Sequence, residues 1–442
     1  MILRTAEAYR RVADAAWRWV LDQVRWDGAL WIPQSVPSQQ VPDERDGVHS
    51  GIGGLAHVLS EIRSARPWTA EEQRLADAIA QQVSGEVAAA TDYTFFTGLT
   101  GAIDVLTALG ATGADVVVDR LMALATPDGW PQTWLGSAWF RPGAHVHDVV
   151  HGTAGVLLGA LWARRHGVAR ASALAHRAAE VLMAEAEELP TGLNWRTVPQ
   201  RFTVAQVDQL PNFSHGLAGI ATALALAGAE LDRPDLTSAA AGGAAHLVTL
   251  GDPSRAGFAV PHRIPGPDRA DEDEFSHGWC HGPVGTSLLF LALHQAGVTG
   301  VAGEAPLVWH RRCLHSVRTS GLPARLRPGF WDNDGRCCGT AGVGDAFLDA
   351  CHRGGDPGDL EFALHLADAL VERAVLDGPH AYWQFLEHRA HDPVLPPGVG
   401  WQQGAAGIAA FLFRAGRVVE EGPVAKAIPR MDTWWSLAPT SG

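Results

Sequence analysis

A short glycine motif recurs seven times along this chain, and it constrains the fold more than any other feature. Each copy reads G-x-x-G and leads into an apolar run such as GLAGIATAL or GTAGVLLGAL. The spacing is roughly 50–65 residues, which is enough for two helices and their connections. The copies begin at Gly51, Gly98, Gly152, Gly216, Gly282, Gly339 and Gly404.

Segments between the copies, such as EEQRLADAIAQQVSGEVAAA, carry apolar residues at helical spacing. Each repeat therefore predicts a helical hairpin whose inner helix begins at the glycine motif. Glycine there permits a positive φ or a close approach of neighbouring backbone. Stacked hairpins that close on themselves predict an all-α fold, an α/α toroid of about seven hairpins. We expect residues 1–442 to form this single domain, with loop insertions around 186–211 and 250–276.

The glycine motifs have a plainer interpretation, in which they only allow helices to pack tightly. We prefer it for the copies at Gly51, Gly98 and Gly404. In the toroid, the inner helices would all begin at one end, where their N-termini favour anionic chemistry. Within the first insertion, residues 194–199 and 201–206 are expected to form a short β-hairpin.

The composition excludes several classes of protein. A formal charge of −14 argues against nucleic-acid binding, which requires clustered Lys and Arg. No apolar stretch approaches the roughly 18–20 residues that span a bilayer, and the charged N-terminus does not resemble a signal peptide. We therefore expect a cytoplasmic protein with no membrane span. Five cysteines, an odd number, do not suggest a disulfide framework. Cys313 and Cys351 stand alone and are expected to be small buried apolar residues.

Reactive residues directly precede four of the glycine copies. These stretches read HDVVHG, NFSHG, WCHG and RCCG. Because the copies are equivalent, we expect their side chains to ring one opening of the toroid. The candidates are His151, His215, Cys280 or His281, and Cys337 or Cys338.

The three cysteines among these candidates form a possible zinc site. Zinc favours thiolate and imidazole ligands, and a catalytic zinc has three protein ligands and one open position. Cys280, Cys337 and Cys338 would supply three sulfurs, because an adjacent cysteine pair at one repeat glycine is matched by a third cysteine in the preceding repeat. His281, beside Cys280, is a competing ligand.

The stretches NFSHGLAGI, WCHGPVG and RCCGTAGVG, in this order among the seven glycine motifs, resemble the LanC-type lanthionine cyclases over nearly the whole chain. The resemblance implies a zinc site with one ligand from WCHG and two from RCCG, at Cys280, Cys337 and Cys338. It also implies that His215 transfers protons and that Asp148, in HDVVHG, orients a partner or takes the thiol proton.

Two positions depart from the usual pattern of that family. Cys338 replaces the usual histidine ligand, which makes the chain similar to cyclase domains that are fused to dehydratases. Ser276 stands where the family has an arginine. Zinc with three protein thiolates carries a charge of about −1, and about −2 once a substrate thiolate binds. The extra charge is expected to make the substrate sulfur more nucleophilic and the cyclase faster and more permissive.

The resemblance implies a Michael-type addition within one peptide. A dehydrated precursor peptide, with leader and core, would present dehydroalanine or dehydrobutyrine to one of its own cysteine thiols, and a thioether ring would form. A dehydratase or another biosynthetic enzyme is a potential partner. No nucleic acid is expected to bind.

Two other functions remain open on the sequence. One is a non-catalytic protein of the same fold that binds peptides or thiols. The other is a glycoside hydrolase on an α/α toroid, which needs two carboxylates about 5–10 Å apart. The candidate carboxylates are Asp92, Asp104, Asp148 and the run at 271–274. Aromatic residues that could contact a peptide near the opening are Trp279, Trp331, Trp383 and Trp401.

Overall fold

The computed structural model describes residues 5–132, 140–205, 207–253, 256–265, 274–324, 333–386, 392 and 394–437. Helices dominate these residues, and the strands form short two-stranded pairs. The chain divides into two compact units. The central unit comprises residues 87–103 and 113–320, and the terminal unit comprises residues 1–86, 104–112 and 321–442. The prediction of a single domain remains a prediction.

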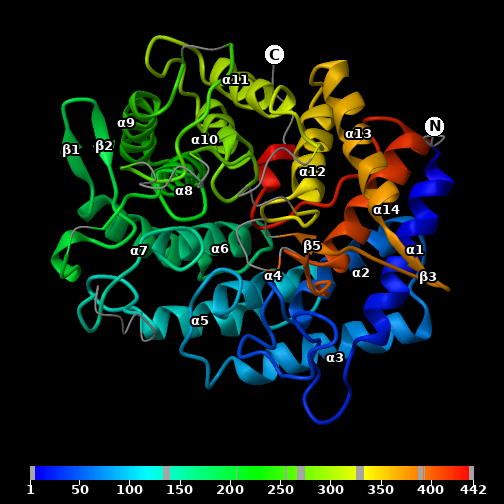
Figure 1. Ribbon diagram of the computed structural model, residues 1–442. Helices are drawn as coiled ribbons and strands as arrows, with labels where there is room; N and C mark the ends of the chain where they lie inside the picture. Colours follow the sequence, from blue (N-terminus) through cyan, green and yellow to red (C-terminus); the bar gives the residue numbers. More distant parts are fainter. Residues whose placement is uncertain are drawn as a thin grey trace. The chain divides into compact units, whose positions relative to one another are not determined.

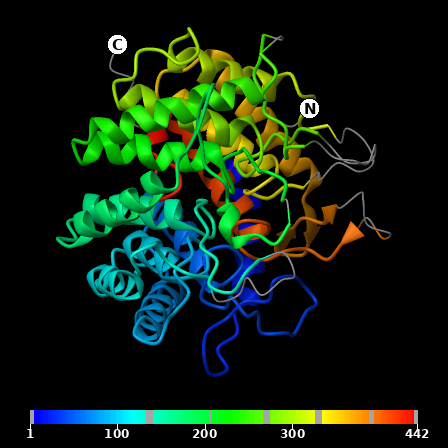
Figure 2. The ribbon, with the colours of Figure 1, turned by 90° about the vertical axis from the view of Figure 1, so that its left-hand side faces the viewer.

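Three helical hairpins form the bulk of the central unit, as the repeats predict (Figures 1 and 2). They are α6 (Thr153–Arg165) with α7 (Ala171–Ala184), α8 (Leu217–Glu230) with α9 (Pro234–Leu250), and α10 (Pro283–Gln295) with α11 (Pro306–Arg318). The first helix of each hairpin is buried along most of its length, and α8 packs against both α6 and α10. A helix that is apolar on every face has to be surrounded by protein. In α7, α9 and α11, burial is confined to one face.

Two further helices begin in the central unit. Helix α5 (Ala114–Leu124) packs against α6 and α7. Helix α4 (Leu99–Leu109) begins in this unit and continues into residues assigned to the terminal unit.

The terminal unit joins the two ends of the chain. Helix α1 (Ala6–Asp22) packs along α14 (Ala405–Glu421), and the blue and red ribbons lie side by side in Figure 1. The Tyr9 hydroxyl donates a 2.6 Å hydrogen bond to Asp368 Oδ1. The unit also contains a short 3-10 turn (Ile52–Gly54), α2 (Leu55–Ala65), α3 (Ala70–Glu86), α12 (Thr340–His352), α13 (Pro357–Arg373) and a 3-10 turn (Trp434–Leu437).

Short strands occur in the connections. Strands β1 (Glu187–Leu189) and β2 (Gly192–Asn194) pair antiparallel, as do β3 (Val375–Asp377) with β4 (His380–Tyr382) and β5 (Phe385–Leu386) with β6 (Val394–Leu395). The hairpin predicted from residues 194–199 and 201–206 is wrong. Residues Gln200–Phe202 form a 3-10 turn instead, and the hairpin lies upstream, where Gly192 adopts φ +136° at its turn. That conformation favours glycine, so the turn sits there.

The glycine motifs begin helices as predicted, but not because of a positive φ. Gly216, for example, is extended, with φ −157° and ψ −155°. Close approach is the reason: a Cβ on Gly219 would lie 2.0 Å from the Phe213 carbonyl oxygen. The same clash, with the carbonyl six residues earlier, recurs at Gly155, Gly285, Gly342 and Gly407. Each glycine therefore lets its loop fold back onto the first turn of the inner helix.

In the part of the chain that the structure describes, no helix is both long and apolar enough to cross a membrane.

Candidate functional site

Backbone hydrogen bonds align the loops that precede the inner helices. In the central unit, Val150 N–H donates to Ser214 O at 3.2 Å and Ser214 N–H to Cys280 O at 2.9 Å. In the terminal unit, Cys337 N–H donates to Gln402 O at 3.0 Å. All of these residues stand two positions before the first glycine of a motif. Cys280 and Cys337 are therefore equivalent positions in their repeats.

The next position along each loop carries the other reactive side chains. His151, His215 and His281 stand directly before their glycines, and Cys338 is their equivalent. In the central unit the ring centroids of His151 and His215 lie 5.3 Å apart, and those of His215 and His281 lie 5.4 Å apart. The repeat thus places three imidazoles in one row, as the sequence predicted for equivalent positions.

Asp148 and His215, both proposed from the sequence for proton transfer, are in direct contact. Asp148 Oδ2 lies 2.7 Å from His215 Nδ1. The other carboxylate oxygen accepts a 2.6 Å hydrogen bond from the backbone N–H of His151. Asp148 is buried, whereas the His215 side chain is 24% exposed. Because Nδ1 faces the carboxylate, Nε2 is the ring nitrogen that can exchange a proton with a substrate.

The imidazoles on either side of His215 favour their neutral forms. Burial lowers the pKa of His151 below its ordinary value, although Asp148 opposes the shift. Burial, with smaller contributions from His262 and His215, lowers the pKa of His281 well below its ordinary value. The His262 ring is 4.0 Å from that of His281. His215 differs from both neighbours in that its ring nitrogen contacts the Asp148 carboxylate.

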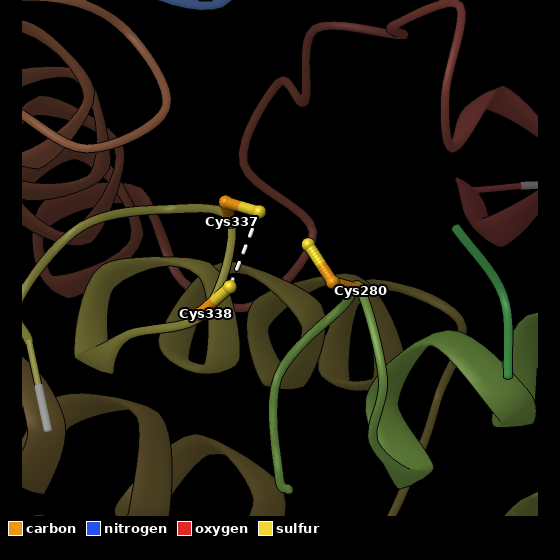
Figure 3. Close-up of side chains that lie close together, drawn as sticks. All are labelled: Cys280, Cys337 and Cys338. Atoms are coloured by element: carbon orange, nitrogen blue, oxygen red, sulfur yellow. Dashed lines mark hydrogen bonds between the residues drawn. The ribbon is translucent and has the colours of Figure 1, made fainter. Parts of the chain in front are cut away.

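The three cysteines proposed as ligands form a cluster that could bind a metal. Their Sγ atoms all lie within 4.8 Å of one another. The sulfur atoms of Cys337 and Cys338 are 3.3 Å apart, and Cys280 points toward the same place (Figure 3). Within the described residues no other group of three or more His, Cys, Asp and Glu side chains converges in this way.

The donor set and spacing of this cluster fit zinc. Tetrahedral zinc with sulfur ligands at about 2.3 Å requires sulfur atoms about 3.8 Å apart. The sulfur atoms of Cys337 and Cys338 are 3.3 Å apart, and all three lie within 4.8 Å of one another. Burial raises the pKa of the Cys338 thiol to about 12, so a thiolate there needs a cation beside it. Metal binding requires all three cysteines in their reduced, thiolate form.

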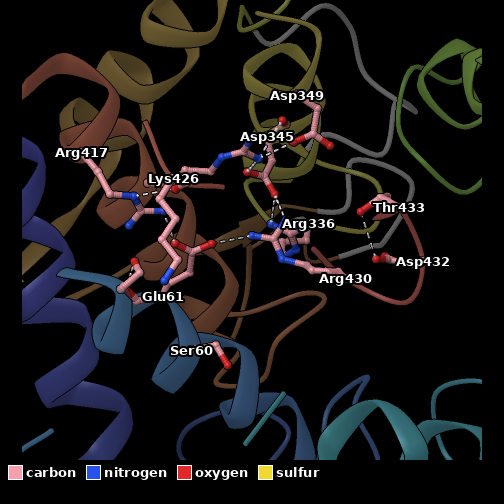
Figure 4. Close-up of polar contacts among 12 residues, drawn as sticks. Ser60, Glu61, Arg336, Asp345, Asp349, Arg417, Lys426, Arg430, Asp432 and Thr433 are labelled. Atoms are coloured by element: carbon pink, nitrogen blue, oxygen red, sulfur yellow. Dashed lines mark hydrogen bonds and ion pairs between the residues drawn. The ribbon is translucent and has the colours of Figure 1, made fainter. Parts of the chain in front are cut away.

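A buried ionic cluster that the sequence analysis missed holds the loop before Cys337. Arg336 Nη1 donates a 2.7 Å hydrogen bond to Asp345 on α12, and the guanidinium lies 4.3 Å from the Trp401 ring centroid. Asp345 also binds Arg414 and Arg430, each at 2.7 Å (Figure 4). Burial lowers the pKa of Arg336, and the Asp345 carboxylate opposes that shift. The sequence feature that could have revealed this cluster is a charged residue inside the apolar run of an inner helix, namely Asp345 in α12 and Arg414 in α14.

This cluster continues to helix α2. Glu61 accepts a 2.9 Å hydrogen bond from Arg430 and a 2.6 Å hydrogen bond from Arg417 on α14. The Glu61 side chain is fully buried. The cluster thus links α2, α12 and α14 with the loop that carries two of the three cysteines.

Several other residues that the sequence analysis singled out have structural contacts or are buried in the core. Asp92 accepts hydrogen bonds from its neighbouring threonines, and Asp104 lies 3.0 Å from His57 Nε2 in the terminal unit. Glu274 is exposed, and the rest of the run at 271–274 lies outside the described residues. Cys313 and Cys351 are buried, as predicted.

The expectation that tryptophans near the opening contact a peptide is not met by those described. Trp279, Trp383 and Trp401 are at most 6% exposed, because they pack in the core. Trp331 lies outside the described residues.

Comparisons with known proteins bear on the family and the fold. A family model described as "Lanthionine synthetase C-like protein" matches residues 42–420. Among solved structures, nisin cyclase is similar at a TM-score of 0.55 and 14% identity, over 84% of this chain and 89% of that one. A protein from Listeria innocua is similar at a TM-score of 0.52 and 10% identity, over 93% of this chain and 98% of that one. At such identities these likenesses show the fold, and they confirm the all-α, α/α-toroid class.

A third solved structure has a lower similarity score. Unsaturated glucuronyl hydrolase from Bacillus sp. GL1 has a TM-score of 0.43 and 12% identity, over 96% of this chain and 98% of that one. That score is too low to support an argument about this chain. No curated protein matches the chain.

Proposed function

Because the chain belongs to the lanthionine synthetase C-like family, we propose that it is a zinc-dependent cyclase that forms thioether rings in a dehydrated precursor peptide. The observation that carries the proposal is the cluster of Cys280, Cys337 and Cys338, whose sulfur atoms lie within 4.8 Å of one another. Three sulfur ligands leave one position of a tetrahedral zinc for a substrate thiol.

The reaction adds the S–H of a peptide cysteine across the carbon–carbon double bond of dehydroalanine or dehydrobutyrine. The sulfur forms a bond to the β-carbon, and the α-carbon gains a proton, so no atom enters or leaves the peptide. Zinc bound by the three cysteines would supply a lowered pKa for the substrate thiol. The remaining chemistry is proton transfer, which is the task of the chain's own side chains.

His215 is suited to that transfer. Its Nδ1 is held 2.7 Å from the buried Asp148 carboxylate, which orients the ring and stabilises the imidazolium form. Nε2 can then accept the proton lost by the thiol and return it to the α-carbon of the enolate. Asp148 is a positioning residue in this scheme, because it acts through His215.

The third thiolate distinguishes this site from one with a histidine ligand. In our proposal Cys338 gives zinc one more negative charge, which weakens its hold on the substrate sulfur and makes that sulfur more reactive. The proposal includes a reducing, cytoplasmic setting, because the ligands must be thiolates. The substrate is a precursor peptide with leader and core, and a dehydratase is the expected supplier of its dehydrated residues.

A model peptide with one dehydroalanine and one cysteine tests this function on reduced, zinc-loaded protein. Cyclisation leaves the peptide mass unchanged but removes its free thiol, so the product no longer reacts with an alkylating reagent. His215→Ala is expected to keep its zinc and lose turnover. If the zinc-loaded parent binds the peptide but never cyclises it, the chain is instead the non-catalytic binding protein.

A further inference from the structure

The first insertion of the chain encloses a pocket of about 600 Å³ in the central unit. Its volume lies within the range of about 300–1,000 Å³ that is usual for ligand sites. Much of its lining is apolar and comes from Phe140, Val198, Val204, Ala205, Val207 and Leu210. Val204 is 55% exposed and Val207 38% exposed, so apolar side chains face solvent here.

One wall of this pocket is bonded to the loops that carry Asp148 and His215. Thr197 lines the pocket, and its hydroxyl donates a hydrogen bond to the His215 carbonyl oxygen. The Thr197 carbonyl accepts a 2.9 Å hydrogen bond from the backbone N–H of His147, which precedes Asp148. A molecule in the pocket would therefore lie against the segment that positions both residues of the proton-transfer pair.

The charged groups at the pocket are paired with residues outside its lining. Arg196 lies 2.8 Å from Glu187 on β1. Asp208 lies 3.8 Å from Arg263. With one cation and one anion, each beside an opposite charge, the lining favours a ligand without net charge.

The backbone along the pocket suits an extended ligand. The segment is held at its ends, where Phe202 O accepts from Arg141 N–H at 2.7 Å and Gln209 exchanges two 2.8 Å hydrogen bonds with Ile264. Between these ends, Val204 and Ala205 make no backbone hydrogen bond with another described residue. Exposed backbone groups of this kind can pair with an extended peptide, while apolar pockets take its side chains.

We infer that this pocket binds a short, extended and uncharged stretch of the dehydrated peptide beside the reacting residues. The inference rests on the proposed cyclase function. Dehydration replaces the hydroxyl of Ser or Thr with a carbon–carbon double bond, so the modified segment becomes less polar. The pocket thus determines which part of the peptide is presented to the proton-transfer pair.

Filling the pocket tests the inference. Ala205 is exposed and lines the pocket, so Ala205→Trp adds bulk there with little effect on the core. The KM for a neutral model peptide with one dehydroalanine and one cysteine is expected to rise at least tenfold, with kcat within twofold and zinc content unchanged. Ala169→Trp is the matched control, because Ala169 is an exposed turn residue of the same unit outside the pocket.

Binding without turnover separates this inference from the cyclase function. In a His215→Ala background, fluorescence anisotropy of the labelled peptide should show weaker binding with Ala205→Trp than with Ala169→Trp. A peptide with glutamates beside the dehydroalanine should bind more weakly than the neutral one. Equal affinity of both variants for the neutral peptide overturns the pocket assignment, even if the parent cyclises. Weaker binding to Ala205→Trp with no turnover by the parent overturns the cyclase function and supports the pocket.

Discussion

Asp345→Asn is the sharpest test of the buried ionic cluster, because one carboxylate there serves three cations. Arg336, Arg414 and Arg430 each place a guanidinium nitrogen 2.7 Å from Asp345. Burial by itself would raise the pKa of Asp345, but these arginines hold it well below its usual range. The carboxylate is therefore charged at neutral pH, and the substitution removes a buried charge.

The expected cost is about 3–5 kcal/mol, the usual loss when one partner of a buried ion pair is removed. The side chains of Asp345 and Arg414 are only 4% and 2% exposed, so water cannot solvate the cations that lose their partner. After the substitution, Glu61 still accepts hydrogen bonds from Arg417 and Arg430, and Asp349 still forms an ion pair with Arg414 at 2.6 Å. Zinc binding should weaken as well, because Arg336 directly precedes Cys337.

Urea unfolding at a fixed zinc concentration, followed by circular dichroism, measures the change. Bound metal stabilises the folded state, so its concentration must be held constant. Asp119→Asn is the matched control, because Asp119 and Arg170 are also 2.7 Å apart but 51% and 62% exposed. Removal of this surface pair should cost about 0–1 kcal/mol. If Asp345→Asn changes the free energy of unfolding no more than Asp119→Asn does, the reasoning about the buried cluster is wrong.

Four further outcomes are expected. Metal analysis of the reduced protein should find about one zinc per chain, and Cys337→Ala should remove most of it without loss of helicity; full retention would reject that ligand. Cys338→His should keep zinc but slow single-turnover cyclisation about tenfold, or about 1.4 kcal/mol of barrier; an equal or faster rate at normal zinc affinity would refute the charge argument. Asp148→Asn should keep zinc and lower kcat, and zinc loss would show that Asp148 acts on the metal site instead. Burial alone would raise the pKa of Glu72, but hydrogen bonds, chiefly from Arg66, lower it to about 2. Because Arg66 is 40% exposed, solvent screening reduces the stabilisation to about 1–2 kcal/mol. This stability should be present above pH 4.5 and lost as the pH falls toward 2, and Glu72→Gln should abolish that part of the pH dependence.

Much of the fold was predictable from the glycine motifs, because they mark a local event. A glycine six residues after a carbonyl is required wherever the loop folds onto the helix that follows, as at Gly219. The same glycine is required in every repeat, at the point where the inner helix begins. The positions of these glycines therefore predict where the helices start and that the fold is all-α. The cause assigned from the sequence was partly wrong, because a close backbone approach and a positive φ both select glycine in a sequence.

The candidate ligands were likewise predictable, because residues at the same distance from the repeat glycine occupy equivalent positions in different repeats. Cys280 and Cys337 stand two residues before their glycines, and Cys338 and His215 stand one residue before theirs. Their equivalent positions identified these side chains as candidates but did not predict which other groups they contact. Their pairing with other groups depends on residues that are far away in the sequence.

Only the tertiary structure decided those pairings. Asp148 and His215 are separated by 67 positions and meet because adjacent loops are aligned by backbone hydrogen bonds. Asp345 and Arg430 are separated by 85 positions and meet inside the terminal unit. A charged residue in an apolar helix shows that a partner is needed, but its identity depends on which helices pack together. The sequence by itself therefore determined the repeat, the helix starts and the candidate ligands, whereas the partners of the buried charges and the pocket of the first insertion were decided by long-range packing.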